Sequence, residues 1–244
     1  RRPPRSTLFP YTTLSDLLAA NEITNFIFSS SCTVYGQADE LPITENAPVK
    51  TAESPYGNTK QIGEEIINDT TKASALNAIS LRYFNPIGAH ETALIGELPL
   101  GVPQNLIPFV TQTAAGIRQE LSVFGDDYPT DDGTAVRDYI HVVDLAKAHI
   151  AALRRLFENK NLTQMEFFNV GTGKGSSVLE VIRAFESVSG QSLKYKIVDR
   201  REGDITAAFA DTSFANRELN WKAQLTLEDG LASAWKWQLK QVSE

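Results

Sequence analysis

The sequence predicts an α/β protein built on a parallel sheet, and three observations support this. Residues 25–31 form a short apolar run that ends in Ser29-Ser30-Ser31, which is typical of a buried parallel strand with polar groups at its carboxyl end. A helix should start at Ser54, since serine is a good N-cap and the proline after it suits the first turn. Residues 78–84 predict the next strand. A strand, a helix and a strand in this order imply a crossover connection and therefore a parallel pair.

The alternation of helices and strands continues after a long irregular segment. Residues 86–105 are rich in glycine and proline, and loops of this length in a compact domain are usually functional or disordered. The patterns beyond it predict helices over 106–116, 142–157, 177–188 and 227–241, and strands over 121–124, 167–170 and 194–198.

Composition excludes several classes of function. The chain has 244 residues, 42% of them hydrophobic, which is enough for a real core. The net charge of -7 and the lack of a Lys/Arg-rich run argue against a nucleic-acid partner. No apolar run approaches the ~20 residues of a membrane span. The one cysteine, Cys32, allows no internal disulfide and fits a reducing compartment such as the cytoplasm.

The residues with the clearest chemistry are Tyr56 and Lys60. Their spacing of four places them on one face of the predicted helix, where the ammonium lowers the pKa of the phenol and lets it act as a base. A serine hydroxyl from the preceding strand end, where open α/β sheets bind ligands, can hold the reacting oxygen. Taken alone, Tyr-x-x-x-Lys is more often an exposed pair on an ordinary helix.

A longer series of motifs, in a fixed order, identifies a family. The series resembles the extended short-chain dehydrogenase/reductase superfamily and, within it, the UDP-glucose 4-epimerase family. The match runs from about residue 13 to the last two tryptophans. Its segments are Ser29-Ser30-Ser31, Thr33-Val34-Tyr35-Gly36, Ser54-Pro55-Tyr56-Gly57 with Lys60, Arg82-Tyr83-Phe84-Asn85-Pro86, Gly88-Ala89-His90, residues 103–108, 123–130 and 132–142, and Arg201-Glu202-Gly203-Asp204.

The resemblance implies a fold and a domain order. The fold would be the C-terminal part of a Rossmann-type parallel sheet followed by a smaller mixed α/β substrate domain. Residues 1–12 would be an unmatched leader, disordered or non-native, residues 13–85 the remnant of the NAD-binding domain, and residues 86–244 mainly the UDP-sugar-binding domain. The superfamily's opening Gly-x-x-Gly-x-x-Gly turn does not occur in this sequence. We therefore expect an N-terminally truncated chain whose site is incomplete.

The resemblance also implies roles for individual residues. Tyr56 would be the base on the sugar 4-hydroxyl, Lys60 would lower its pKa and hold the cofactor ribose, and Ser31 would bind the same oxygen. Tyr83 would lie in the nicotinamide pocket. The UDP-sugar contacts would be Asn85, Asn105, Leu106, Phe124, Arg137, Arg201 and Asp204. The residue types suit this task, since two arginines can fork onto a diphosphate, an aromatic ring can cover uracil, and a carboxylate can accept from a ribose hydroxyl.

The implied activity is the NAD-dependent interconversion of UDP-glucose and UDP-galactose through a 4-keto sugar, a step of galactose metabolism, in a cytoplasmic homodimer. Ala208 would line the pocket beside the sugar 2-substituent. Because alanine is small there, the pocket should also admit the N-acetylated pair, UDP-GlcNAc and UDP-GalNAc.

Two alternatives to an epimerase stay open. One is an inactive fragment that binds UDP at best. The other is a sugar-nucleotide 4,6-dehydratase, whose extra acid and base groups would match Cys32 and Thr33, although neither of these can do the work of a carboxylate.

Two further patterns are interpreted as structural. Asp138, His141 and Asp144 suit a strand–helix junction better than a metal site, so no metal is expected. Residues 171–175, Gly-Thr-Gly-Lys-Gly, resemble a phosphate loop but lack its spacing.

Overall fold

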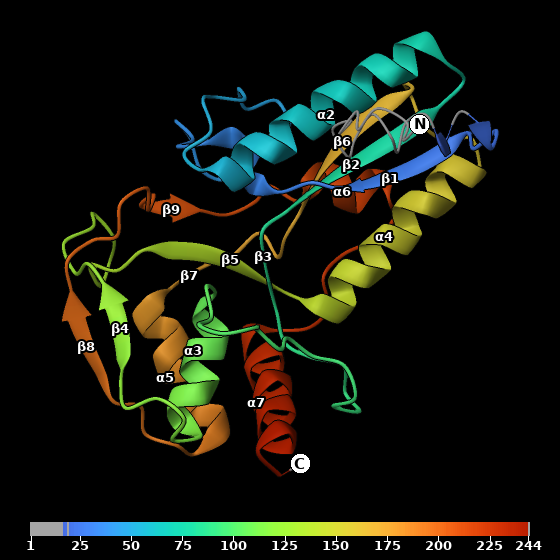
Figure 1. Ribbon diagram of the computed structural model, residues 1–244. Coiled ribbons are helices and arrows are strands. Elements are labelled where there is room, and N and C mark those ends of the chain that lie inside the picture. The colour runs from blue at the N-terminus through green and yellow to red at the C-terminus, as the bar shows by residue number, and fades with distance from the viewer. Residues whose placement is uncertain (1–16, 19, 244) are drawn as a thin grey trace, which may run out of the picture.

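The computed structural model describes residues 17, 18 and 20–243, and Figure 1 shows how its elements are arranged. The predicted leader, residues 1–12, lies outside the described residues. In chain order the elements are β1 (Asn25–Ser29), the 3-10 helix η1 (Cys32–Tyr35), α2 (Pro55–Ala73), β2 (Asn77–Tyr83), β3 (Asn85–Ile87), α3 (Leu106–Ala114), β4 (Leu121–Phe124), β5 (Val136–His141), α4 (Val142–Phe157), β6 (Met165–Val170), β7 (Gly175–Ser177), α5 (Val178–Ser189), β8 (Tyr195–Val198), β9 (Ala207–Ala208), α6 (Ser213–Glu218) and α7 (Leu227–Ser243).

The first sheet confirms the predicted α/β class. Its order is β1-β2-β6, and both pairs are parallel. Alternate residues of β2 point to opposite faces: Ile79 and Leu81 pack with α4 and α6, while Ala78 packs with Phe28 and Ile67 on the side of α2. In Figure 1 the sheet accordingly lies between α2 and α4.

The two predicted domains are interleaved in the chain. The strand β6 and the helices α4 and α6 follow residue 86, yet they pack on the sheet that β1 and β2 begin. The division into 13–85 and 86–244 therefore stays a prediction, and the first sheet draws on both ranges.

A second lobe contains the short strands. It combines the sheet β3-β5-β7, with β9 paired to β5, and the parallel pair β4-β8. The helices α3, α5 and α7 pack around a core that includes Val110, Phe185 and Leu231. The strand β5 runs from this lobe directly into α4 of the first sheet and so links the two (Figure 1).

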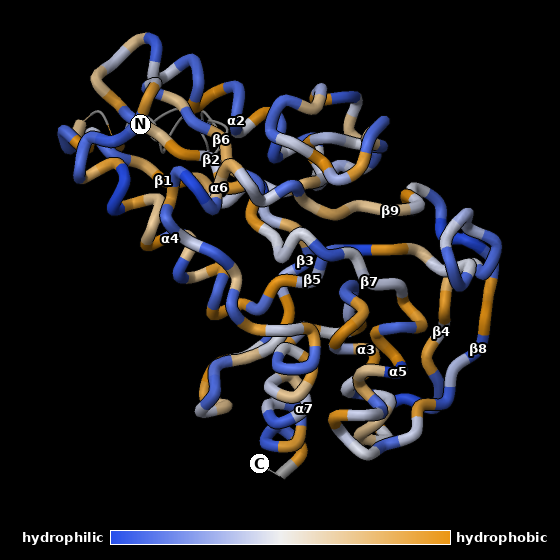
Figure 2. Tube along the Cα trace, turned by 180° about the vertical axis from the view of Figure 1, so that it is seen from behind, coloured by the Kyte–Doolittle hydropathy of each residue, from blue (hydrophilic) through white to orange (hydrophobic). Residues whose placement is uncertain are grey.

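Helix α4 illustrates the amphipathic pattern that the sequence predicts. Leu145, Ala148, Ala152 and Leu156 are buried at intervals of three and four residues, and Figure 2 shows hydrophobic and hydrophilic positions alternating along this helix. No helix in the described part of the chain is both long and apolar enough to cross a membrane.

Candidate active site

The predicted catalytic side chains meet where β1 and β2 end beside the start of α2. The Lys60 Nζ donates to the Ser29 carbonyl oxygen at 2.8 Å and lies 5.4 Å from the centre of the Tyr56 ring. Tyr56 is 50% exposed, so its hydroxyl can meet a ligand. Burial lowers the pKa of Lys60, because desolvation disfavours the ammonium.

Local sequence fixes the start of α2 against the strand ends. The Ser54 Oγ accepts from the Gly57 amide at 3.1 Å and caps the helix, as the Ser-Pro pair predicts. Gly57 allows close packing on η1, since a Cβ there would lie 3.2 Å from the Thr33 carbonyl oxygen. The first turn, which carries Tyr56, is therefore held next to the segment that follows Ser31.

Tyr83 and Ser31 complete this group. The pKa of Tyr83 is raised by burial and by its side-chain hydrogen bond with the adjacent Tyr56 phenol. Ser31 is 5% exposed, and its hydroxyl accepts from the Thr33 amide at 3.3 Å as the N-cap of η1. The next residue, Cys32, is inert at neutral pH, because burial raises the pKa of its thiol to about 12.

Seven predicted ligand residues line one cavity of about 200 Å³. They come from five separate parts of the chain: Asn85, Asn105, Leu106, Phe124, Arg137, Arg201 and Asp204. Ser31, Tyr56, Lys60 and Tyr83 do not line this cavity, but its residue Asn85 follows Tyr83 by only two residues as β2 passes into β3.

Charge in this cavity is arranged around one carboxylate. The Asp204 Oδ1 lies 2.7 Å from the Arg201 NH2 and 3.9 Å from the Arg137 NH2. Two guanidinium groups thus face one carboxylate at this side of the cavity and can bind an anionic group there, while a second carboxylate, that of Glu97, lies on Asn105 and makes the lining neutral as a whole. The Arg201 guanidinium lies 5.6 Å from the centre of the Phe124 ring, and this ring is 41% exposed and able to stack on a planar group.

The cavity also contains residues for which the resemblance implied no role. They include Glu97, which accepts from the Asn105 Nδ2 at 2.8 Å, and Ser122, Tyr139 and Val178. Ser122 and Tyr139 face the cavity only through the pairing of strands that lie far apart in the chain, so no local pattern could have shown them.

Ala208, like Ser31, is a predicted ligand residue that does not line the cavity. It lies in β9 beside Arg137 of β5, is 3% exposed, and packs in a cluster with Val34, Tyr35 and Phe84. Its role beside the sugar stays a prediction.

The remaining polar candidates are engaged elsewhere. Asp138 accepts from the Thr172 amide at 2.8 Å and from the Gly173 amide at 3.0 Å. This internal carboxylate therefore occupies the amide groups of the Gly-rich turn that a phosphate would need. Asp144 accepts from the Gln224 and Leu225 amides, and His141 accepts from the Val143 amide.

Comparison with known proteins agrees with this geometry. A family model described as GDP-mannose 4,6 dehydratase matches residues 12–234. The UDP-glucose 4-epimerase of Mus musculus is 50% identical over 231 residues, which are 94% of this chain and 66% of that protein. The UDP-glucose 4-epimerase of Bacillus subtilis is 50% identical over 222 residues, 91% of this chain and 64% of that protein. The chain thus spans just under two thirds of the length of these curated relatives.

Solved structures extend the match to the fold. A UDP-glucose 4-epimerase from Stenotrophomonas maltophila, with bound NAD and formylated UDP-arabinopyranose, superposes with a TM-score of 0.91 at 47% identity, covering 95% of this chain and 68% of that one. The enzyme from Bifidobacterium longum, in complex with NAD+ and UDP, gives 0.89 at 47% identity with the same coverage. The chain belongs to the UDP-glucose 4-epimerase family of the extended short-chain dehydrogenase/reductases, as its motifs predict.

Proposed function

We propose that the protein is an NAD-dependent UDP-glucose 4-epimerase that interconverts UDP-glucose and UDP-galactose through a 4-keto sugar. The observation that carries this proposal is one cavity, lined by Arg137, Arg201, Asp204 and the exposed Phe124, that also contains Asn85, two residues beyond the strand end at which Tyr56 and Lys60 lie. The relatives crystallised with NAD and UDP or a UDP-sugar support it.

The cavity residues suit a uridine diphosphate. Arg137 and Arg201 would bind the diphosphate oxygens, and Phe124 would stack on the uracil. The Asp204 carboxylate, which now accepts from Arg201 at 2.7 Å, would then accept from a ribose hydroxyl. This arrangement leaves the sugar to extend past Asn85 towards Tyr56.

The residues beside the cavity also fit a nicotinamide cofactor. An ammonium has three N–H donors, and Lys60 donates to Ser29 through one of them, so it can also hold ribose hydroxyls. Tyr83 lies beside Tyr56, where the nicotinamide would meet the sugar. Held by Lys60 and Tyr83, NAD would supply reversible hydride transfer at carbon 4 of the sugar.

The chain's own residues would transfer the proton of the sugar 4-hydroxyl. Tyr56 would take it from the 4-hydroxyl and return it after reduction, while Ser31 would hold the same oxygen. Lys60 is partly buried, so water screens its ammonium less than at the surface, which strengthens its effect on the Tyr56 phenolate.

A dehydratase is disfavoured by the segment after β1. Elimination of water needs acid and base groups where this chain has Cys32 and Thr33, and the Cys32 thiol, with a pKa of about 12, stays protonated. The second alternative, a chain that binds UDP without turnover, is separated by experiment.

The test supplies NAD and UDP-galactose and measures UDP-glucose formed, with Tyr56→Phe as the matched variant. Phenylalanine keeps the ring and removes the ionisable oxygen, so turnover should fall about a hundredfold to ten-thousandfold. Binding of UDP, measured by calorimetry, should not change. The assay is run on the 244-residue chain and on a hybrid in which the Bacillus subtilis relative supplies the part that this chain does not match. UDP binding without turnover in both proteins would favour the inactive alternative.

Three finer points belong to the same proposal. The epimerase would also convert UDP-GalNAc to UDP-GlcNAc, and Ala208→Tyr would suppress only this acetylated reaction if the residue reaches the sugar. An intact UDP-galactose reaction with no detectable acetylated turnover would reject this point. The protein would act in the cytoplasm as a homodimer, which cell fractionation and light scattering can check.

A further inference from the structure

One buried carboxylate, that of Glu64 on α2, lies beneath the catalytic group. Its Oε1 accepts from the Ser30 Oγ at 2.7 Å, the Ser80 Oγ at 2.7 Å and the Arg82 Nε at 2.9 Å. Its Oε2 accepts from the Arg82 NH2 at 2.6 Å. All four residues are at most 6% exposed. A single side chain of the helix is therefore bonded to the end of β1 and to β2.

Glu64 shares a helix face with the catalytic pair. Tyr56, Lys60 and Glu64 follow one another at intervals of four residues, so they lie one above the other along α2. A helix anchored through Glu64 cannot turn about its axis without breaking four buried hydrogen bonds. The anchor thus fixes the direction in which Tyr56 and Lys60 point.

The same network holds the backbone on both sides of Ser31. Ser30, which bonds to Glu64, immediately precedes it. Tyr35, at the end of η1, accepts from the Arg82 NH1 at 3.0 Å and donates to the Asn169 Oδ1 at 2.8 Å. Because Ser31 caps η1, its hydroxyl lies between two segments that the Glu64–Arg82 pair holds in place.

We infer that Glu64 is a positioning residue, which acts through Ser30 on one side and through Arg82 and Tyr35 on the other to set Ser31 opposite the Tyr56–Lys60 pair. Glu64 does not itself reach the ligand, since it is buried below the strand ends. This inference rests on the proposed function, because the geometry that Glu64 fixes matters only if Tyr56 is the base.

The first test compares Glu64→Gln with Glu166→Gln in the 244-residue chain. Glutamine keeps the shape and removes the charge at both sites. Glu166 is an equally buried carboxylate on a buried arginine, Arg155, but it lies at the opposite end of the sheet from Ser31. Turnover is measured with NAD and UDP-galactose. The Tyr56 phenol is titrated independently, from the phenolate absorbance that Tyr56→Phe removes in each background.

We expect Glu64→Gln to lower kcat by about tenfold to a hundredfold, because a shift of about 1 Å in a catalytic group has an effect of this size. KM should stay within about twofold, since the UDP cavity is untouched. The Tyr56 titration should move to higher pH, because Lys60 is no longer held beside the phenol. Glu166→Gln should leave kcat and the titration unchanged.

A milder pair of variants keeps the test valid if Glu64→Gln does not fold. Ser30→Ala and Ser80→Ala each remove a fully buried hydroxyl that donates to the same Oε1 at 2.7 Å. Only Ser30 is joined to Ser31, so Ser30→Ala should shift the Tyr56 titration and lower kcat severalfold, and Ser80→Ala should do neither.

The outcomes separate this inference from the proposed function. Equal effects of Ser30→Ala and Ser80→Ala, or of Glu64→Gln and Glu166→Gln, would overturn it. An unsubstituted sequence that gives no epimerisation, either as the 244-residue chain or in the Bacillus subtilis hybrid, would reject the proposed function. In that case the Tyr56 titration tests the positioning role by itself. A shift that occurs in the Ser30 and Glu64 variants but not in the Ser80 and Glu166 variants supports positioning by Glu64. No shift in the Ser30 and Glu64 variants refutes it.

Discussion

Two buried glutamate–arginine pairs each connect a helix to the first sheet. They are alike in burial but differ in the groups that they contact. The site pair, Glu64 with Arg82, has side chains 7% and 6% exposed. The remote pair, Glu166 with Arg155, has side chains 5% and 4% exposed and is bidentate, with the Arg155 Nε at 2.8 Å from the Glu166 Oε2 and the NH2 at 2.9 Å from the Oε1. The two pairs are matched in burial and in the charges of the paired residues. Any difference between the effects of Glu64→Gln and Glu166→Gln must therefore come from the groups that surround each pair.

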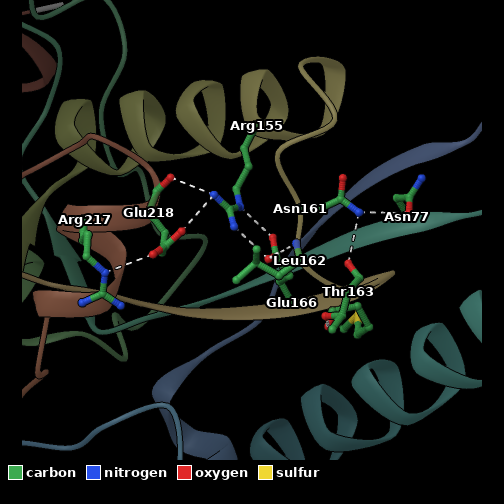
Figure 3. Close-up of polar contacts among 9 residues, drawn as sticks. Asn77, Arg155, Asn161, Leu162, Thr163, Glu166, Arg217 and Glu218 are labelled. Atoms are coloured by element: carbon green, nitrogen blue, oxygen red, sulfur yellow. Dashed lines mark hydrogen bonds and ion pairs between the residues drawn. The ribbon is translucent and has the colours of Figure 1, made fainter.

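The remaining hydrogen bonds of the two pairs differ in kind. The site pair forms hydrogen bonds with three side-chain hydroxyls, those of Ser30 after β1, Ser80 in β2 and Tyr35 in η1. The remote pair, drawn in Figure 3, binds mainly backbone: Glu166 accepts from the Leu162 amide at 2.9 Å, and the Arg155 NH1 donates to the Glu218 carbonyl oxygen at 3.0 Å. The remote pair thus attaches the C-terminal ends of α4 and α6 to β6. The site pair instead holds side chains of β2, η1 and the segment after β1 next to one another.

The pairs also differ in how far each arginine depends on one partner. The Arg155 NH1 has a second carboxylate, the Glu218 Oε2, at 3.3 Å (Figure 3). Arg82 otherwise contacts neutral groups, namely the Tyr35 hydroxyl and the rings of Tyr35 and Phe167, and a second carboxylate, that of Glu45, acts on it through space without an ion pair. Burial opposes the charge of Arg82, yet the pKa of Arg82 is raised, because its interactions with Glu64 and Tyr35 together outweigh burial. Loss of the paired glutamate should therefore leave the buried charge of Arg82 less well compensated than that of Arg155.

The largest expected effect follows from this dependence. Breaking a buried ion pair by removing one charge costs about 3–5 kcal/mol, and we expect Glu64→Gln to fall in this range. Glu166→Gln should cost less, because Glu218 still balances Arg155. Urea unfolding of both variants measures the two free energies. If Glu166→Gln proves the more destabilising, the number of carboxylates around each arginine does not explain the difference.

How well the sequence anticipated these regions depends on how local each feature is. Helix α4 and the strand β4 begin and end where predicted, and β1, α2 and β2 lie within about two residues of prediction, because caps and periodicity are local signals. The strands β3, β7 and β9 have two or three residues, too few for a period. The strand β5 passes straight into α4, so no turn marks its end.

The two ion pairs had no local signal at all. Glu64 appears in sequence as one more polar residue of an amphipathic helix, and Arg82 as an interruption in an apolar strand. They meet only because α2 packs on the face of β2 that carries Ser80 and Arg82. The cavity residues, by contrast, could be predicted from the family motifs, although their contacts with one another could not.

The second expected effect is on stability at alkaline pH. It distinguishes the two pairs because Tyr35 contacts the site pair and not the remote pair. Burial raises the pKa of this phenol from 10.0 to about 12 in the folded protein. Between these values the unfolded chain loses the Tyr35 proton and the folded chain keeps it, so stability falls as pH rises from about 10 to 12. The full shift corresponds to about 2–3 kcal/mol.

Tyr35→Phe should therefore flatten the fall in unfolding free energy across this range, and Glu166→Gln should leave it unchanged. Some alkaline loss will persist in both variants, because burial also raises the pKa values of Tyr139 and Cys32 to about 12. Urea unfolding at several alkaline pH values gives the slopes. A slope that Tyr35→Phe does not reduce would mean that the Tyr35 phenol titrates alike in both states.

The smallest expected effect lies at the exposed rim of the remote pair. The Arg217 Nε lies 3.0 Å from the Glu218 Oε1, but its side chain is 64% exposed (Figure 3). Exposed ion pairs contribute about 0–1 kcal/mol, because water screens the charges and the side chains lose freedom when they pair. Arg217→Ala should thus change the unfolding free energy by at most about 0.5 kcal/mol, and this small change should shrink further in high salt. A loss comparable to that of Glu166→Gln would show that Arg217 holds the Glu218 carboxylate against Arg155. In that case the backbone bonds would not suffice to fix the remote pair, and the contrast with the hydroxyl-linked site pair would have to be redrawn.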